Sequence, residues 1–344
     1  MEKYFVVDKL YKTYSGGYNI LSSVSFSLDR GDKLAILGGN GSGKTTLLYT
    51  LCGLENVSNG KILVDGREVS GNLKENNIGY LPETLPFYEN KSVEYNLKKS
   101  LNIRKIEKSQ NYDNLIKIFE IENILSTKVK KLSNFDKIKV AFCRLFMLDR
   151  KLYLVDNVLP TLSETEINYI TKILEKLTID KTIIFAISSM QLVEKVCANK
   201  LALLSYGTIT DYESVDKKYA MDNTASSIKL VQGEGADISV DIVENGVKIC
   251  DTILPYNKKI FSNVFTKGMF VVPKSKIKVS DNLRFSSKII DIVNGIIIAE
   301  DGNNTNVFYG LNTENYNVGE YIYFDFDIDN LPLFDIGSER KITL

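Results

Sequence analysis

The stretch Leu37-Gly38-Gly39-Asn40-Gly41-Ser42-Gly43-Lys44-Thr45-Thr46 decides the fold of this chain. It fits the pattern G-x-x-x-x-G-K-[ST], follows an apolar segment at 33–37 and precedes the helix-like run Leu47-Leu48-Tyr49. A strand, a glycine-rich turn and a helix N-terminus in this order form a loop whose backbone N–H groups, with one lysine, hold nucleotide phosphates. The alternative is a glycine-rich strand-to-helix turn without a ligand.

Composition places the chain among ordinary globular proteins, and its 344 residues suffice for two domains. Lys+Arg and Asp+Glu both number 43, so no net positive charge attracts nucleic acid, and we expect no nucleic-acid partner. The sequence contains no histidine, which excludes histidine metal ligands and an imidazole base.

The cysteines Cys52, Cys143, Cys197 and Cys250 are far apart and form no C-x-x-C pair, so we expect buried free thiols. No apolar run reaches the roughly 18 residues that span a bilayer. The N-terminus, residues 1–4, lacks the apolar core of a signal peptide. These features predict a cytoplasmic protein.

Residues 1–222 read as alternating strands and helices, which predicts an α/β domain with much parallel sheet. Strands are expected at 4–7, 23–28, 33–37, 152–155 and 182–187, with helices after Gly43, Ser163 and Met190. The pattern between about 84 and 143 is helical and polar, which indicates a helical insertion.

Residues 223–344 change to short β-rich runs separated by Asn, Asp and Gly. These runs lie at 237–242, 269–272, 289–293, 295–298, 306–309 and 320–325. Short strands at close spacing predict an all-β domain, a small barrel or sandwich.

Residues 1–222 resemble the ATP-binding subunit of ABC transporters. Residues 223–344 resemble the OB-like TOBE domain of maltose-type sugar importers, because the run 319–327 and the tail Leu333-Phe334-Asp335 match its last strand. Leu159 and Leu162 fit the importer pattern E-P-L-S-N-L-D. The resemblance implies an α/β P-loop ABC ATPase domain with a helical insertion, followed by an all-β domain.

The same resemblance implies ATP and Mg²⁺ as cofactors. It assigns Gly38–Thr46 to the phosphates, Tyr14 to stacking on adenine, the Thr45 hydroxyl to Mg²⁺, and Asp156 to Mg²⁺ through water. Glu83 occupies the position of a magnesium-binding glutamine and is a further candidate ligand. The alternative to adenine stacking is that Tyr14 is a half-buried tyrosine at a strand end. The alternative to metal binding is that Glu83 is a solvated loop carboxylate.

The positions that the resemblance assigns to catalysis are altered. A glutamate that polarises the attacking water and a histidine after a later strand are replaced by Asn157 and Met190. An amide can orient water but cannot take its proton, and a thioether cannot donate to a phosphate. No catalytic residue is therefore predicted to be intact, and Met190 is expected to be a packing residue.

The signature L-S-G-G-Q of the family reads Leu132-Ser133-Asn134-Phe135-Asp136 in this chain. The serine is kept, but the glycines that allow a partner's γ-phosphate to approach are replaced, Phe135 adds bulk and Asp136 adds negative charge. The segment 160–163 also lacks the family's S-N-L-D aspartate. We therefore expect this segment to contact poorly the ATP that is bound at a partner's phosphate loop.

We therefore predict a subunit of a sugar or oligosaccharide importer that binds Mg-ATP but hydrolyses it weakly or not at all. The implied partners are transmembrane permease subunits and a second ABC ATPase subunit, in a heterodimer or a homodimer, on the inner face of the membrane. One alternative is an ATP-sensing regulatory protein without a transporter. Another is an active ATPase with an unusual base such as Glu83 or Glu164.

Overall fold

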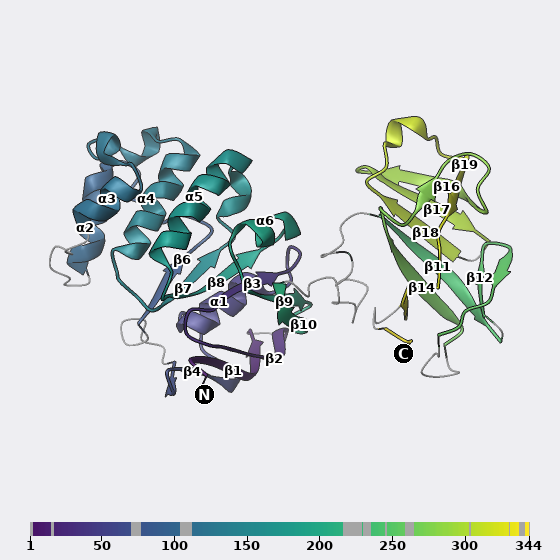
Figure 1. The fold of residues 1–344 in the computed structure, drawn as a ribbon, viewed down its shortest axis with the longest axis horizontal. Coiled ribbons are helices and arrows are strands. Elements are labelled where there is room, and N and C mark those ends of the chain that lie inside the picture. The colour runs from purple at the N-terminus through teal and green to yellow at the C-terminus, as the bar shows by residue number, and fades with distance from the viewer. Residues whose placement is uncertain are drawn as a thin grey trace. The chain divides into compact units, whose positions relative to one another are not determined.

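The structure, a computed structural model, divides the chain into two compact units, Met1–Asp216 and Lys217–Leu344, which are described separately (Figure 1). It describes residues 3–14, 17–69, 77–103, 112–215, 229, 235–244, 246–258, 265–302, 304–329, 331–336 and 341–343. The predicted boundary between residues 222 and 223 lies outside the described residues.

The first unit alternates strands and helices as predicted. Its strands are β1 (Phe5–Thr13), β2 (Asn19–Leu28), β3 (Lys33–Leu37), β4 (Asn59–Val64), β5 (Arg67–Glu68), β6 (Ile78–Leu81), β7 (Leu152–Asp156), β8 (Thr182–Ile187), β9 (Lys200–Ser205) and β10 (Thr208–Ser214). Its α-helices are α1 (Lys44–Cys52), α2 (Val93–Ile103), α3 (Tyr112–Ile118), α4 (Asn134–Phe146), α5 (Glu164–Leu177) and α6 (Met190–Lys195).

The central sheet of this unit has the order β10-β9-β3-β8-β7-β6. All neighbours from β9 to β6 run parallel, and β10 pairs antiparallel with β9. Every residue of β7 and β8 is buried, as is typical of parallel strands covered on both faces. Because the strands are parallel, β3, β8, β7 and β6 all end at the same edge of the sheet.

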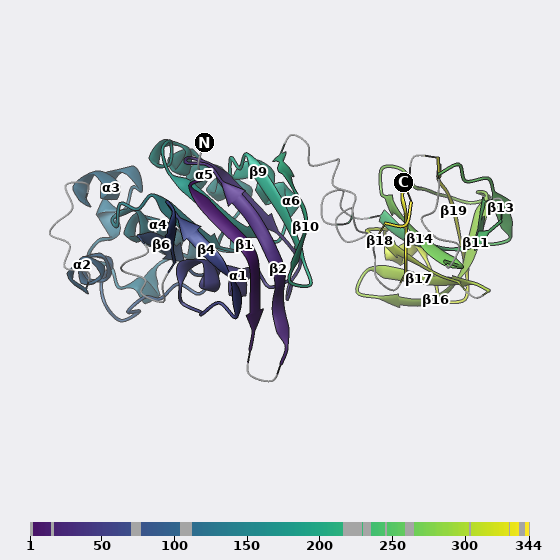
Figure 2. The ribbon, with the colours of Figure 1, turned by 90° about the horizontal axis from the view of Figure 1, so that it is seen from below.

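A second, antiparallel sheet has the order β2-β1-β4-β5. Figure 2 shows β1 and β2 side by side as a long curved ribbon. Leu47, Leu48 and Leu51 of α1 are fully buried in a core shared with residues of both sheets, including Leu10 and Leu34. Burial of these apolar side chains stabilises the two-sheet arrangement and holds α1 between the sheets.

Helices α2, α3 and α4 gather on one side of the unit, away from β1 and β2 (Figure 1). The predicted insertion at 84–143 thus contains α2, α3 and most of α4. Helix α4 buries Ile138, Val140, Ala141 and Phe142, which anchors the insertion to the rest of the unit. No helix of the described residues is long and apolar enough to cross a membrane.

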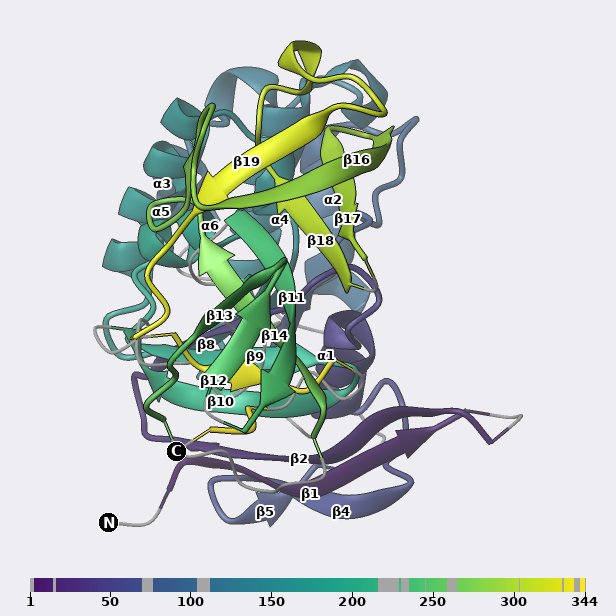
Figure 3. The same ribbon diagram turned by 90° about the vertical axis from the view of Figure 1, so that its right-hand side faces the viewer.

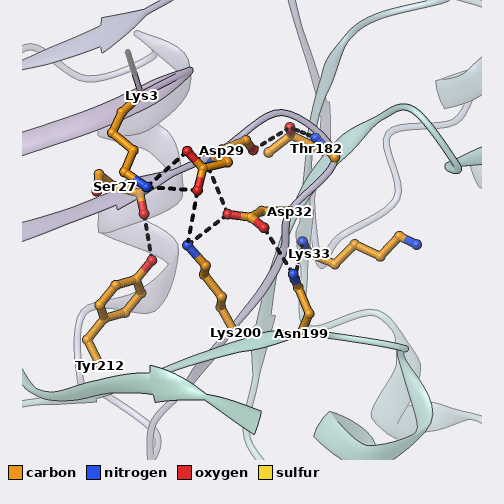
Figure 4. A network of polar contacts seen from close by, with 10 residues as sticks. Lys3, Ser27, Asp29, Asp32, Lys33, Thr182, Asn199, Lys200 and Tyr212 are labelled. Carbon is orange, nitrogen blue, oxygen red and sulfur yellow. Dashed lines mark hydrogen bonds and ion pairs between the residues drawn. The ribbon is translucent and has the colours of Figure 1, made fainter. Parts of the chain in front are cut away.

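A polar network ties the β2–β3 turn to the start of β9 (Figure 4). Asp32 lies 2.8 Å from Lys200 Nζ, accepts a hydrogen bond from Asn199 Nδ2 and accepts another from the Asp29 N–H. Burial by itself raises the pKa of Asp32, but these three partners together hold it below its ordinary value of 3.8. The ionised carboxylate therefore stabilises this end of the sheet.

The second unit is all β in its described part. Its strands are β11 (Gly235–Val243), β12 (Gly246–Ile249), β13 (Thr252–Leu254), β14 (Lys267–Pro273), β15 (Lys278–Val279), β16 (Phe285–Val293), β17 (Ile296–Asp301), β18 (Asn304–Tyr309), β19 (Tyr321–Asp325) and β20 (Leu333–Phe334). They form one antiparallel sheet in the order β13-β12-β11-β18-β17-β16-β19-β15, and β14 pairs with β11 and β20.

The sheet of the second unit encloses an apolar core, and Figure 3 shows β16 and β19 next to one another. Phe270, Phe285, Phe308 and Phe324 are almost fully buried in this core. Burial alternates along β16 as far as Ile289 and along β18 and β19, so one face of each of these strands lies inward, whereas β14 is buried from Gly268 to Pro273. The predicted fold class, an α/β unit with a helical insertion followed by an all-β unit, is confirmed.

Candidate nucleotide-binding site

The predicted site residues gather at the edge where the parallel strands end. The loop 38–43 follows β3, Asp156 is the last residue of β7, and Glu83 follows β6. Ser188, which the sequence did not mark as a site residue, follows β8 at the same edge. Leu37 of β3 pairs with Ile187 of β8, and Asp156 of β7 pairs with Ala186 of β8. These pairings place the ends of the three strands side by side. In open parallel sheets, ligands bind at this carboxyl edge.

The glycine loop has a backbone that only glycine adopts easily. Gly43 has φ 103°, in the left-handed region, and caps α1 without a side chain. A Cβ on Gly38 would lie 2.5 Å from Leu204 O, so this position also needs glycine. The first N–H groups of α1 have no partner within the helix, which suits them to an anion.

Lys44 lies across this loop and is 8% exposed. Its Nζ donates hydrogen bonds to Gly38 O and Gly39 O, both at 2.8 Å. Burial lowers the pKa of Lys44 from its ordinary value of 10.5, and the carboxylates of Asp156 and Glu83 oppose this effect. The ammonium is thus held at the mouth of the loop, where a phosphate would meet it.

Asp156 is 1% exposed, and its Oδ2 accepts a hydrogen bond from the Tyr80 hydroxyl at 3.1 Å. Burial raises its pKa, Thr45 and Tyr80 lower it, and Glu83 raises it further. Asp156 Oδ1 and Ser42 Oγ are buried and have no hydrogen-bond partner among the described residues. Two unpartnered oxygens beside the loop fit a ligand that supplies a cation and phosphate groups.

These donors fit Mg²⁺ bound together with a nucleotide. Thr45 and Asp156 offer hard oxygen atoms, which Mg²⁺ prefers, and the ion typically takes its other ligands from water and phosphates. The described residues contain no group of three or more His, Cys, Asp or Glu that can hold a metal by itself.

Asn157 lies at the centre of a hydrogen-bond chain across three strand ends. Its Nδ2 donates to Glu83 Oε1 at 2.9 Å, and its Oδ1 accepts from Ser188 Oγ at 3.3 Å. Its backbone N–H donates to Ala186 O at 3.1 Å. The two residues at the predicted positions, Glu83 and Asn157, are thus brought into direct contact. Glu164, the other candidate base, instead pairs with Lys195 at 2.6 Å.

Met190 is the first residue of α6 and is half-buried. Its thioether adds no proton donor to the strand edge. Its predicted role as a packing residue fits this position.

Tyr14 follows β1 and is 38% exposed. Lys12 Nζ lies 4.9 Å from the centre of the Tyr14 ring and is itself held by Glu55 Oε2 at 2.8 Å and Asn56 O at 2.9 Å. The lysine therefore contacts one face of the ring, and the tyrosine is neither buried nor fully exposed.

The signature-like segment 132–136 begins α4 and is held by contacts within the chain. Ser133 caps the helix by accepting a hydrogen bond from the Asp136 N–H, and its hydroxyl lies 2.8 Å from Asp136 Oδ2. Lys139 lies 2.9 Å from Asp136 Oδ1, so the charge of Asp136 is paired. Burial raises the pKa of Asp136, but hydrogen bonds from Lys139 and Ser133 lower it overall.

Phe135, in the same segment, packs against helix α5. Its ring packs edge-on against the Tyr169 ring with 5.5 Å between centroids, and Lys139 Nζ lies 5.1 Å from its centre. Leu132 precedes the helix cap and is half-buried. The Phe135 side chain is therefore half-buried by contacts within the chain.

Sequence reasoning missed four side chains around these residues: Lys12, Tyr80, Thr161 and Ser188. Tyr80 and Asp156, like Ser188 and Asn157, are far apart in sequence, and their contacts depend on strand order. No local pattern marks such partners.

The comparisons with known proteins agree with this geometry. The model of the ABC transporter family matches residues 21–160. The lipopolysaccharide export system ATP-binding protein LptB of Haemophilus influenzae is 30% identical over a match that covers 49% of this chain and 73% of that protein. The sn-glycerol-3-phosphate import ATP-binding protein UgpC of Vibrio vulnificus is 23% identical, and the match covers 98% of this chain and 95% of that protein.

Among solved structures, cbiO1 from Clostridium perfringens, part of an ABC transporter complex, superposes with a TM-score of 0.58 at 23% identity. That match covers 67% of this chain and 96% of that one, and it shows a shared fold. The site at the strand edge, the phosphate loop and the similarity to these proteins together define an ATP-binding protein of the P-loop class. The chain belongs to the ABC transporter family, as an ATP-binding subunit.

Proposed function

We propose that this chain is the ATP-binding subunit of an ABC importer for sugars or oligosaccharides, that it binds Mg-ATP, and that it hydrolyses ATP weakly or not at all. One observation carries the proposal: the glycine-rich loop 38–43 and the neutral Asn157 amide lie at the same edge of the central sheet, and the oxygen and the nitrogen of this amide are both already hydrogen-bonded. Such a site has the parts for holding ATP. An amide cannot take the proton of an attacking water.

The importer assignment is supported by UgpC, an import protein whose match extends over nearly the whole chain, including the β-rich second unit. We propose that this second unit is TOBE-like and serves dimerisation or regulation. Transmembrane permease subunits and a second, catalytically competent ABC ATPase would be the partners. The subunit would then lie on the cytoplasmic face of the membrane.

Nucleotide binding and phosphate release test the core of the proposal. The full chain should bind ATP in the presence of Mg²⁺ by calorimetry, and Lys44→Ala should remove this binding. Phosphate release by the wild-type chain should stay close to that of Lys44→Ala. Rapid release that disappears in Lys44→Ala would show an active ATPase and refute the hydrolysis-deficient assignment.

Isolation of the assembled complex from its native membrane tests the context. Transmembrane subunits and a different ABC ATPase should be recovered with this chain. A soluble complex without any membrane protein would instead support an ATP-sensing regulatory protein. Recovery of two copies of this chain with the permease would support the homodimer.

A further inference from the structure

We propose that the second unit contains a binding site for a small neutral saccharide, in a cavity beside the buried carboxylate of Asp237. All the residues that line this cavity belong to the unit Lys217–Leu344. The inference goes beyond the proposed function, because it requires neither nucleotide binding nor hydrolysis nor a transporter. The ligand class follows from the hydrogen-bonding groups and the charge of the cavity.

The outer face of the sheet forms one wall of the cavity. Strands β14, β11, β18 and β17 lie next to one another in this sheet (Figure 1). Ala236 and Ile238 of β11 lie in the apolar core, so Asp237 between them points to the opposite face. Phe308 of β18 pairs with Ala236 and also lies in the core, so Tyr309 shares the outer face with Asp237.

The cavity has a volume of about 880 Å³, a size typical of small-molecule sites. Val271 of β14 pairs with Asp237, and Ile296 of β17 pairs with Tyr309, so two apolar side chains lie beside the two polar ones. The cavity is also lined by Leu311, Asn294 and Asn312. Apolar side chains next to amides suit a sugar ring, which presents C–H groups and hydroxyls together.

The two carboxylate oxygens of Asp237, a residue that is 7% exposed, differ in their partners. Its Oδ2 accepts a hydrogen bond from the Tyr309 hydroxyl at 2.9 Å and lies 2.6 Å from Lys229 Nζ. Its Oδ1 is buried and has no hydrogen-bond partner within the part of the chain that the structure describes. A buried acceptor without a donor is unfavourable, and a ligand hydroxyl would supply a charge-assisted hydrogen bond to it.

The charge of the cavity favours a neutral ligand. Lys229 and Asp237 are the only charged residues among the described residues that line it, and they form an ion pair. The pair leaves no net charge to attract an anion or a cation. A single carboxylate is also a poor site for a bare metal ion, which takes several oxygen ligands. A neutral hydroxyl donor therefore fits Asp237 Oδ1 best.

Saturation-transfer NMR of the full chain with glucose, glucosamine and glucuronate tests the inference. The three probes share one ring size but are neutral, cationic and anionic at pH 7. Glucose should bind the wild-type chain at least as tightly as either charged probe. In Lys229→Met the charge of Asp237 is no longer balanced, so the affinity for glucosamine relative to glucose should rise roughly tenfold.

Asp237→Asn tests the acceptor itself. It keeps the shape of the side chain but removes the charge, so the affinity for glucose should fall roughly tenfold or more, as expected when a hydrogen bond to a charged group is lost. Asp251→Asn is the matched control, because the Asp251 side chain is fully exposed and does not line this cavity. Its affinity should equal that of the wild type. Melting curves check the fold of each variant, and Lys229→Met remains a test if Asp237→Asn does not fold.

Three results would overturn the inference: no binding of glucose by the wild-type chain, equal binding of glucose by folded Asp237→Asn, or tighter binding of a charged probe than of glucose by the wild type. The proposed function is tested separately, because Lys44→Ala should lose ATP but keep the wild-type affinity for glucose. A wild-type chain that binds glucose but not ATP would support this inference and refute the proposed function.

Discussion

The Asn134 side chain donates a hydrogen bond to the Thr161 hydroxyl across 2.9 Å. This bond joins the first residue of α4 to the turn that follows β7, two segments that the ABC resemblance assigns to communication between subunits. Together with the Ser133 cap and the Phe135–Tyr169 ring contact, it stabilises the altered signature within the chain itself. The substitutions in this segment thus have structural roles of their own.

Restoring the family signature should therefore destabilise the fold. The triple variant N134G/F135G/D136Q places two glycines in the first turn of α4 and removes the ring contact. We expect the free energy of unfolding to fall by about 2–3 kcal/mol. Each glycine should contribute roughly 0.5–1 kcal/mol to this loss, and removal of the aromatic pair about 1 kcal/mol. Urea denaturation measures the change.

Asp136→Gln alone serves as the control for that variant. It removes the ion pair with Lys139 but keeps a good helix former, so the loss should stay near or below 1 kcal/mol. A triple variant as stable as the wild type would show that the contacts of Asn134 and Phe135 contribute nothing.

Asp156→Asn should stabilise the nucleotide-free chain. Because burial is the main cause that raises the pKa of Asp156, its ionised form is less favourable in the folded than in the unfolded chain. Removing the charge should raise the free energy of unfolding at pH 7 by on the order of 1 kcal/mol, as is common for substitutions at functional sites. The same variant should bind Mg-ATP more weakly.

The pH dependence of the free energy of unfolding tests whether the Asp156 charge causes the stabilisation by Asp156→Asn. Wild-type Asp156 becomes neutral as pH falls through its raised folded pKa, so the advantage of Asp156→Asn should shrink in acid and vanish below the ordinary value of 3.8. Asp149→Asn is the control, because hydrogen bonding from Lys181 lowers the pKa of Asp149. It should not stabilise the chain, and destabilisation by Asp156→Asn would contradict the account.

Asp32→Asn should have the opposite effect at neutral pH. The folded pKa of Asp32 lies below 3.8, so its stabilisation is present above that value and is lost as pH falls through the folded pKa. We expect a loss of about 1–3 kcal/mol at pH 7, typical of hydrogen bonds to a charged group, and a smaller loss near pH 3. Urea titrations at several pH values measure both.

Lys3→Met provides the comparison for Asp32. Lys3 pairs with Asp29 in the same network, but both side chains are about half exposed, so this pair should contribute less than about 1 kcal/mol. Equal losses from the two substitutions at pH 7 would show that burial of Asp32 does not strengthen its contacts.

Tyr14→Ala should weaken ATP binding by roughly tenfold, the size typical of one base stacked on an aromatic ring. Tyr14→Phe should bind nearly as well as the wild type, because the ring and its contact with Lys12 remain. Calorimetry with ATP measures the change, and inorganic triphosphate is the control. Equal loss for ATP and triphosphate would mean that Tyr14 does not contact the base.

Much of the fold was predictable because its signals are local. The run 33–37, the glycines of 38–43 and the apolar residues after them specify a strand, a turn and a helix within a short stretch, and all three are present. The change to short, turn-separated strands after residue 223 likewise predicted an all-β unit. The antiparallel sheet of β1, β2 and β4 was not foreseen, since its pairings join distant segments.

The sequence by itself determined that this chain has a phosphate loop, and which residue types stand at the positions around it. Only the tertiary structure decided which of these residues touch. Asn157 and Glu83 lie 74 residues apart, and they meet because β7 and β6 are neighbours in the sheet and end at the same edge. Residue spacing predicts local backbone geometry, whereas contacts between strand ends follow from strand order and register, which a single sequence does not state.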